Sequence, residues 1–231
     1  MYTRNVAGRE IELAVSGKLY KDALVMYDRE TGTLWAQVDG SALRGPLQGH
    51  RLEEIPAVQA PWRLWKQLHP DTLVLRKPAG VRGSPYADYF RDPNRQGLSG
   101  TRGDSRLGGK EMVIGLHEAG DAVAIAVARL KTEPLVNTKL NRKPVIVFYA
   151  IGAQTAAVFR PFAGGRWLNF RLVRRKGSVH LEDAETGSQW SPLEGRAISG
   201  PLAGTQLERV PYLHSFWYAW SAYRPQTRLL R

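Results

Sequence analysis

The feature that most constrains this fold is a stretch of sequence that occurs twice. Residues 28–76 align without a gap with residues 183–231, and 20 of the 49 aligned pairs are identical. The identical pairs are mostly turn and core residues, among them Gly32 and Gly187, Trp35 and Trp190, Pro46 and Pro201, Trp62 and Trp217, and Trp65 and Trp220. A chain that repeats such residues at a fixed offset is expected to build two related units.

Each copy reads as a β-hairpin followed by a short helix. In the first copy, LVMYD and TLWAQV alternate apolar and polar residues on either side of RETG, which predicts two half-buried strands joined by a tight turn. PWRLWKQLHP then places Trp62, Trp65 and Leu68 on one helical face, between Pro61 at the start and Pro70 beyond the end. SFWYAWSAYRP repeats this design, and TLVL and TRLL predict closing strands. We expect the tryptophans to pack in a core.

The two copies differ upstream of the aligned part. Residues 111–157 contain four apolar runs, MVIGL, AVAIAVA, VIVFYA and TAAVF, that predict strands and have no counterpart in the first copy. The sequence thus holds about one and a half copies, either because the first unit is genuinely shortened or because the chain has been cut or mis-started upstream. We expect an incomplete first unit at residues 1–76, a connecting loop rich in Gly and Pro at 77–110, and a second unit at 111–231.

These patterns predict a mainly β fold of the α+β type. Two related antiparallel β-rich units with short helices would arise by internal duplication, with the first unit shortened at its N-terminal side. A length of 231 residues is sufficient for either one large β-rich domain or two small ones.

The net charge of +12 would favour a polyanionic partner if the charge were gathered on one face. The densest basic cluster is RLVRRK, which contributes Arg171, Arg174, Arg175 and Lys176. The alternation of a strand would divide these side chains between two faces. Binding of nucleic acid or another anion by this cluster is therefore kept as an alternative, not as the leading hypothesis.

No local pattern predicts a catalytic residue, a bound metal or a cofactor. GDSRLGGKE does not have the spacing of a phosphate-binding loop, the five histidines fall at no metal-ligand spacing, and the chain has no Cys. No G-x-S-x-G nucleophile elbow occurs either. We therefore lean against an enzyme for this chain.

A ligand site, if the chain has one, is expected where the connecting loop meets the first hairpin. We place it at Tyr86 and Tyr89 of GSPYADYF, at Lys110 and Glu111, and at Asp28. A long connection between elements is often functional. An Asp beside a hairpin turn more often caps backbone N–H groups, so Asp28 also has a purely structural interpretation.

Longer stretches of the chain resemble a known family. LAVSGKLYKDALVMYDRETGTLWAQVDGSALRGPLQGHRLEEIPA, SRLGGKEMVIGL, GSPYADYF and the C-terminal TGSQW, GPLAGTQL and FWYAW resemble a bacterial and archaeal family catalogued as domain of unknown function 3179. The resemblance covers nearly the whole chain. Its members are often exported or membrane-anchored, so the resemblance implies an extracytoplasmic location, although the sequence contains neither a leader peptide nor an 18-residue apolar run.

The family also typically carries a Cys-Pro-Leu-Cys segment just before the part equivalent to residues 2–4. In the second unit the equivalent stretch is FYAIGAQTAAVF, with Ala150, Gly152 and Ala153 at the positions where cysteines would stand. A metal or redox role implied by that segment therefore cannot be transferred to any residue of this chain.

Three functions remain as hypotheses. The leading one is a non-catalytic binding or scaffold domain of the cell envelope, with an envelope protein or a small ligand as its partner. The first alternative is a degenerate or truncated metal-dependent or redox enzyme whose Cys-containing segment lies upstream. The second is a basic protein that binds nucleic acid.

Overall fold

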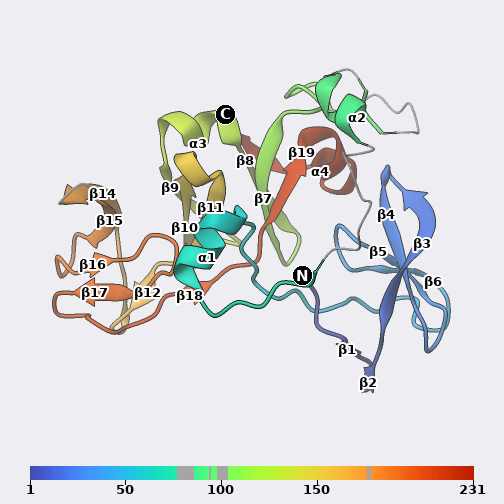
Figure 1. Ribbon diagram of the computed structural model, residues 1–231, viewed down its shortest axis with the longest axis horizontal. Coiled ribbons are helices and arrows are strands. Elements are labelled where there is room, and N and C mark those ends of the chain that lie inside the picture. The colour runs from blue at the N-terminus through green and yellow to red at the C-terminus, as the bar shows by residue number, and fades with distance from the viewer. Residues whose placement is uncertain (77–85, 94, 98–103, 176–177) are drawn as a thin grey trace.

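The computed structural model describes residues 1–76, 86–93, 95–97, 104–175 and 178–231. The described chain is mainly β, with short sheets arranged in a row and four short α-helices (Figure 1). The predicted fold class is confirmed. We use "first unit" for residues 1–76 and "second unit" for residues 111–231.

The strands of the first unit form one end of the row, whereas its helix at residues 62–68 lies next to the second unit (Figure 1). Its elements are β1 (Asn5–Val6), β2 (Arg9–Glu10), β3 (Leu13–Tyr20), β4 (Ala23–Asp28), β5 (Leu34–Ala36), β6 (Ala42–Arg44) and α1 (Trp62–Leu68). The strands β3, β4, β5 and β6 form an antiparallel sheet in that order. Between the units, the described part of the connection contains α2 (Ala87–Arg91).

The second unit supplies the centre and the other end of the row. Its elements are β7 (Met112–Glu118), β8 (Asp121–Ala126), α3 (Val127–Thr132), β9 (Leu135–Leu140), β10 (Lys143–Ala150), the 3-10 helix η1 (Ile151–Ala153), β11 (Thr155–Arg160), β12 (Phe162–Ala163), β13 (Arg166–Trp167), β14 (Phe170–Arg175), β15 (Ser178–Asp183), β16 (Gln189–Trp190), β17 (Ala197–Ser199), β18 (Glu208–Arg209), β19 (Leu213–Phe216), α4 (Trp217–Tyr223) and β20 (Arg228–Leu230).

Three four-stranded sheets organise this unit. Their strand orders are β14-β15-β16-β17, β18-β11-β10-β9 and β19-β7-β8-β20. All neighbouring strands in them are antiparallel except β8 and β20, which pair in parallel with Leu229 opposite Ala124. The four apolar runs predicted to be strands are therefore confirmed, but the run AVAIAVA is a strand only to Ala126, after which α3 begins.

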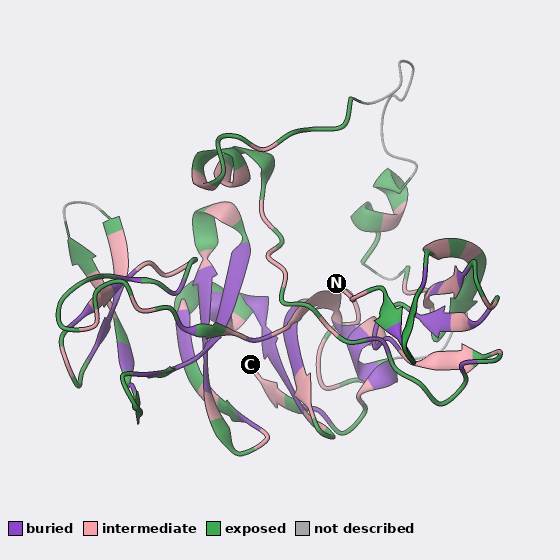
Figure 2. Ribbon diagram, turned by 90° about the horizontal axis from the view of Figure 1, so that it is seen from below, coloured by how far each residue is buried: buried purple, intermediate pink, exposed green. Residues whose placement is uncertain are grey.

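Two of these sheets enclose the main core. Ile114 and Ile125 of the β7–β8 hairpin pack against Val145 and Val158 of the β9–β11 sheet, and all four side chains are buried. Strands of both sheets are accordingly buried in Figure 2. The opposite face of the β9–β11 sheet packs on the sheet that contains Trp190, which joins the two ends of the second unit.

Hydrogen bonds recur at positions that are 155 residues apart. The indole of Trp35 donates to Oδ2 of Asp28 at 2.8 Å, and the indole of Trp190 donates to Oδ2 of Asp183 at the same distance. Further pairs of equivalent bonds are Thr31 N to Asp28 and Thr186 N to Asp183, Leu47 N to Thr33 and Leu202 N to Ser188, and the Trp65 indole to Thr72 and the Trp220 indole to Thr227. The repeated residues thus make the same local contacts.

The two helices of the repeat have different surroundings. In α4, Trp217 and Trp220 are buried against Val113, Ala122 and Ala124 of the β7–β8 hairpin. In α1 no residue is buried, and Trp62 is 50% exposed. The prediction of core packing is therefore right for α4 and wrong for Trp62, because no described strand lies where β7 and β8 cover α4.

The predicted closing strands also differ. TRLL forms β20, but TLVL, residues 72–75, is not a strand. An isolated extended segment gains nothing from an unpaired backbone, and the partner that β8 offers to β20 has no described counterpart next to residues 72–75. The prediction that residues 72–75 form a closing strand is therefore wrong.

Candidate binding pocket beside helix α1

The residues expected from the sequence to form a ligand site do not all meet. Asp28 is completely buried, where it accepts hydrogen bonds from Trp35 and from the backbone N of Thr31. Burial opposes ionisation, but these hydrogen bonds outweigh it and hold the pKa of the Asp28 carboxyl below its usual value. Asp28 is thus occupied inside its own hairpin.

Tyr89 and Lys110 do come together. The Lys110 ammonium lies 3.8 Å from the centre of the Tyr89 ring and donates hydrogen bonds to the carbonyls of Tyr89 and Asp92. The Tyr89 hydroxyl is 2.6 Å from that of Tyr218. These contacts hold α2 against α4, so packing accounts for the positions of Tyr89 and Lys110.

The two remaining residues of the expected site are Glu111 and Tyr86. Glu111 accepts a 3.0 Å hydrogen bond from the backbone N of Gly108, and its carbonyl accepts one of 2.8 Å from Trp217 N. Tyr86 is 64% exposed at the start of α2. A ligand site at these residues stays a prediction.

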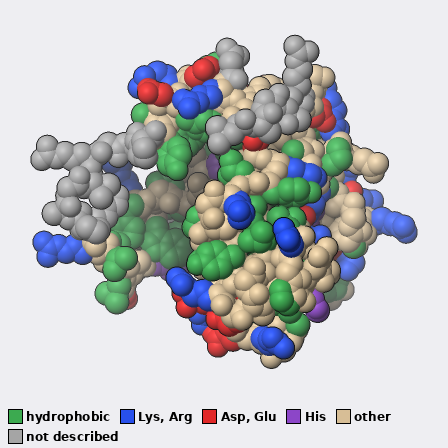
Figure 3. Space-filling view, turned by 90° about the vertical axis from the view of Figure 1, so that its right-hand side faces the viewer, with side chains coloured by type: hydrophobic (Ala, Val, Ile, Leu, Met, Phe, Trp, Pro, Cys, Tyr) green, Lys and Arg blue, Asp and Glu red, His purple; other side chains and the backbone are tan. Residues whose placement is uncertain are grey.

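The basic cluster is divided as strand alternation requires. Arg171 and Arg175 both bind the carboxylate of Glu182 on one face of the β14–β15 hairpin, whereas Arg174 lies on the other face beside Leu172 and Val179. The arginine hydrogen bonds keep the pKa of Glu182 below its usual value. Lys176 lies outside the described residues. The face of the molecule in Figure 3 likewise carries its Lys and Arg side chains dispersed among hydrophobic and uncharged ones.

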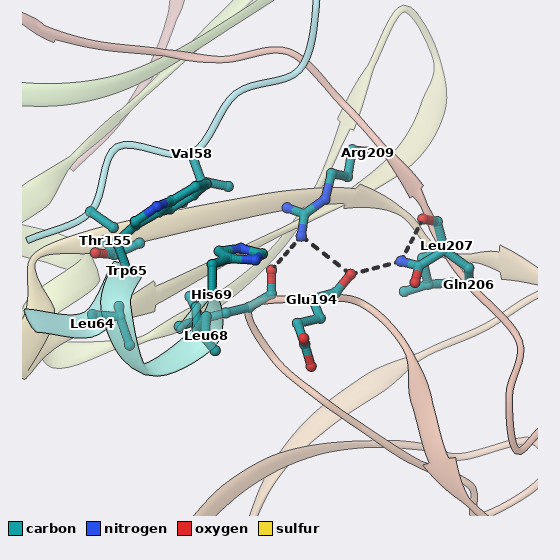
Figure 4. Close-up of a pocket in the computed structure, with 12 residues that line it drawn as sticks. Val58, Leu64, Trp65, Leu68, His69, Thr155, Glu194, Gln206, Leu207 and Arg209 are labelled. Carbon is teal, nitrogen blue, oxygen red and sulfur yellow. Dashed lines mark hydrogen bonds between the residues drawn. The ribbon is translucent and has the colours of Figure 1, made fainter. Parts of the chain in front are cut away.

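A pocket lies between α1 and the second unit (Figure 4). It encloses about 470 Å³, within the size range of small-molecule sites. Its lining is Val58, Ala60, Leu64, Trp65, Leu68, His69, Thr155, Leu193, Glu194, Gln206, Leu207 and Arg209. We call it the α1 pocket.

Arg209 is the cationic group of the α1 pocket. Its guanidinium donates hydrogen bonds to the carbonyls of Leu193 at 2.8 Å and Glu194 at 3.4 Å, and it lies 5.2 Å from the Phe159 ring centre. Desolvation lowers the pKa of Arg209 from its ordinary value. Among the described residues no carboxylate lies within ion-pair distance of it, and the Glu194 carboxylate points away from it (Figure 4).

Aromatic and aliphatic groups form the opposite wall. The rings of Trp65 and His69 lie 4.2 Å apart, centre to centre. The Trp65 indole N–H is already bonded to Thr72 at 3.0 Å, so this ring offers the pocket mainly an apolar surface. An aromatic wall facing a partly dehydrated cation is suited to a ligand with an apolar body and an anionic end.

The equivalent junction on the other side of the molecule has different charges. There the end of α4 meets the first unit, and Asp39 lies 3.3 Å from Arg51 and 3.5 Å from Arg224. Glu54 lies 2.9 Å from His117 of β7. Both acidic groups of that junction therefore have basic partners.

Sequence reasoning missed the α1 pocket. The signal that would have found it is in the alignment of the two copies, where Arg209 stands at the position of Glu54 and His69 at that of Arg224. A reversed charge inside an otherwise repeated unit marks a position whose surroundings have changed.

Two further kinds of feature are absent from the described residues. Nowhere in them do three or more His, Asp or Glu side chains group so as to hold a metal ion. Within the same residues, no helix has the length and apolarity needed to cross a bilayer.

Comparison with known proteins leads to one family. No curated protein matches the chain. No solved structure matches it either. A family model matches residues 1–227 of the 231. The chain therefore belongs to the family described as "Protein of unknown function (DUF3179)".

Proposed function

We propose that this chain is a non-catalytic binding domain and that the α1 pocket holds an apolar group that ends in a carboxylate. The observation that supports the proposal most directly is Arg209, a half-buried guanidinium that forms no ion pair with a described carboxylate, although the more distant charge of Glu194 favours its ionised form. Removing a cation from water is costly unless an anion or several acceptors compensate. The carbonyls of Leu193 and Glu194 engage one end of the guanidinium, and a bound carboxylate would complete its coordination.

The apolar lining supports the second half of the proposal. Leu64, Trp65 and Leu68 of α1 face Leu193 and Leu207 across the pocket. Each methylene that leaves water on binding contributes about 0.8 kcal/mol. An aliphatic or aromatic body of moderate size would therefore bind here, while Arg209 would select its anionic end.

A location in the cell envelope is part of the same proposal. It is supported by the resemblance of the sequence to proteins that are often exported or membrane-anchored. Fractionation of the native cells with an antibody against the chain tests it. Recovery in the periplasmic or membrane fraction is expected, and recovery with the soluble cytoplasmic proteins would refute this part alone.

Calorimetric titration with sodium octanoate tests the pocket. Octanoate combines an apolar chain with one carboxylate, and we expect Arg209→Gln to weaken its binding about tenfold. Arg166→Gln removes an exposed arginine elsewhere and is the matched control. Octanamide, which lacks the charge, should bind the native protein weakly.

Equal octanoate affinity in the native protein and the Arg209→Gln variant would refute the proposal. So would the absence of binding at millimolar octanoate. Unfolding temperatures of both variants, measured without ligand, identify any loss that is due to misfolding.

A further inference from the structure

Two apolar segments flank α1 without forming a sheet. Before the helix, residues 56–61 belong to no strand. After it, Leu73, Val74 and Leu75 are 96%, 63% and 94% exposed. These three consecutive aliphatic residues are exposed, and so is half of Trp62 in the helix; exposed apolar groups of this kind often mark an interaction site.

The second unit contains the same three parts in paired form. Its counterpart of residues 58–61 is β19, which pairs with β7, and its counterpart of residues 73–75 is β20, which pairs with β8. The hairpin β7–β8 lies between these two outer strands in the order β19-β7-β8-β20. The first unit therefore has both outer segments and the helix, but its described residues offer no inner hairpin.

The surroundings of the equivalent tryptophans in α4 and α1 differ in the same way. Trp220 of α4 lies directly over Gly115 of β7, so closely that a Cβ atom at Gly115 would be 2.4 Å from the indole ring. Trp220 is 1% exposed. Trp65, its counterpart in α1, instead borders the α1 pocket. The space that β7 fills beneath α4 corresponds to part of the pocket beneath α1.

Charge indicates which hairpin would fit. In the second unit His117 of β7 bonds to Glu54 at 2.9 Å. The counterpart of Glu54 is Arg209, so a strand lying under α1 as β7 lies under α4 would direct its equivalent side chain at Arg209. A carboxylate at that position would complement the guanidinium.

A second copy of this chain cannot supply this hairpin from its own fold. In the described structure β7 and β8 already pair with each other and with β19 and β20, so neither has a free edge. To offer them to another molecule, the copy would first have to dismantle that sheet. The β7–β8 hairpin of a folded second copy is therefore not available as the occupant.

We propose that α1, residues 58–61 and residues 73–75 form a docking surface for a β-hairpin of a partner polypeptide. The proposal rests on the proposed function, because it identifies the apolar, carboxylate-bearing ligand of the α1 pocket as a Glu or Asp side chain on an apolar strand. One strand pairs with residues 58–61, and the other pairs in parallel with residues 73–75. A glycine of the hairpin faces Trp65. The recognition is β-strand addition, in which main-chain hydrogen bonds hold the strand and pockets read its side chains.

A cyclised peptide with the sequence of residues 112–126 and the change His117→Glu is the probe. We expect it to bind the full chain and to slow hydrogen exchange at the amides of residues 73–75 at least about tenfold. The same peptide with His117→Lys is the matched control, and it should bind at least about tenfold more weakly because it directs an ammonium at Arg209. Equal affinity of the two peptides, or peptide binding without protection of residues 73–75, would overturn the proposal.

Two protein variants separate this proposal from the one on which it rests. Leu73→Asp with Leu75→Asp should abolish peptide binding and leave octanoate binding intact, whereas Arg209→Gln should weaken both. Leu19→Asp, at a leucine that is 50% exposed on β3, is the control for adding charge to the surface. Octanoate binding that depends on Arg209, combined with no peptide binding, overturns only the hairpin proposal. If the native protein binds neither octanoate nor the peptide, the proposed binding pocket is overturned as well.

A second copy as occupant is a further outcome of the same measurement. Protection of residues 73–75 that rises with the concentration of the chain alone would show that the chain covers this surface by self-association. That result would also overturn the proposal of a separate partner.

Discussion

The indole nitrogen of Trp190 donates a 2.8 Å hydrogen bond to Oδ2 of Asp183, and both side chains are almost completely buried. Trp190→Phe keeps most of the ring but leaves a carboxylate oxygen without its donor. We expect this change to lower the free energy of unfolding by about 1–3 kcal/mol, which is the range for an unsatisfied buried polar group. Chemical denaturation measures it.

The matched control is Trp167→Phe, because Trp167 is 43% exposed and meets the ring of Phe162 edge-on at the surface. Its effect should stay within about 0.5 kcal/mol. Trp35→Phe, which removes the equivalent bond to Asp28, should resemble Trp190→Phe. If Trp190→Phe proves as mild as Trp167→Phe, the buried bond is not a main support of the hairpin.

Gly115 tests the contact between the β7–β8 hairpin and α4. A Cβ there would be 2.4 Å from Trp220, so Gly115→Ala must push the indole away from a close-packed core. We expect a loss of about 1–3 kcal/mol in the free energy of unfolding. Gly152→Ala adds the same methyl where nothing lies within 4 Å, and it should change stability little. Similar stability of the two variants would mean that α4 shifts without cost.

His214 predicts a dependence of stability on pH. Burial lowers the pKa of its imidazole below the ordinary value, and the buried Nε2 has no hydrogen-bond partner among the described residues. The unfolded chain then binds a proton at a higher pH than the folded chain does. Stability from this residue is therefore complete above about pH 6.5 and falls as the pH drops below it.

Thermal unfolding between pH 7.5 and 5.5 measures this loss. His214→Gln should reduce the decrease in unfolding temperature across the range, whereas His50→Gln, at an exposed histidine, should leave it as in the native protein. An unchanged pH profile for His214→Gln would assign the decrease to other groups.

Asp39 links the first unit to the end of α4. It lies within 3.5 Å of both Arg51 and Arg224, and Ser41 bonds to its other oxygen. Asp39→Asn removes the charge that these two guanidinium groups share. We expect faster hydrogen exchange at residues 217–224 and a stability loss of about 1–3 kcal/mol. Asp88→Asn, at an exposed ion pair with Arg91, is the control and should alter neither.

The repeat allowed the local structure to be predicted well. The hairpins around Gly32 and Gly187 and the helices at Trp62 and Trp217 follow from alternation, turn residues and helical spacing, all of which act over a few residues. The failures were at Trp62 and residues 72–75, where the residues are those of a buried unit but the covering strands are missing from the described structure. The local sequence predicts which face of a segment can pack in a core. It does not predict whether another element is present to pack against that face.

The ligand site expected at the connecting loop stays a prediction. Long loops and hairpin turns often carry function, but Asp28 caps its own turn and Lys110 packs on Tyr89. The α1 pocket joins residues 58–69 to residues 155–209. Its composition depends on which units pack together, and no short pattern encodes that.

The order of strands in the sheet β19-β7-β8-β20 has a consequence for synthesis. The inner hairpin is complete at Ala126, but its flanking strands begin only at Leu213 and Arg228. At translation rates of about 5–20 residues per second, about ten seconds pass before β19 and β20 are made. Until then the backbone groups along the outer edges of β7 and β8 have no strand to pair with. During that interval the nascent chain is most vulnerable to aggregation, and a chaperone or another strand could occupy the edges first.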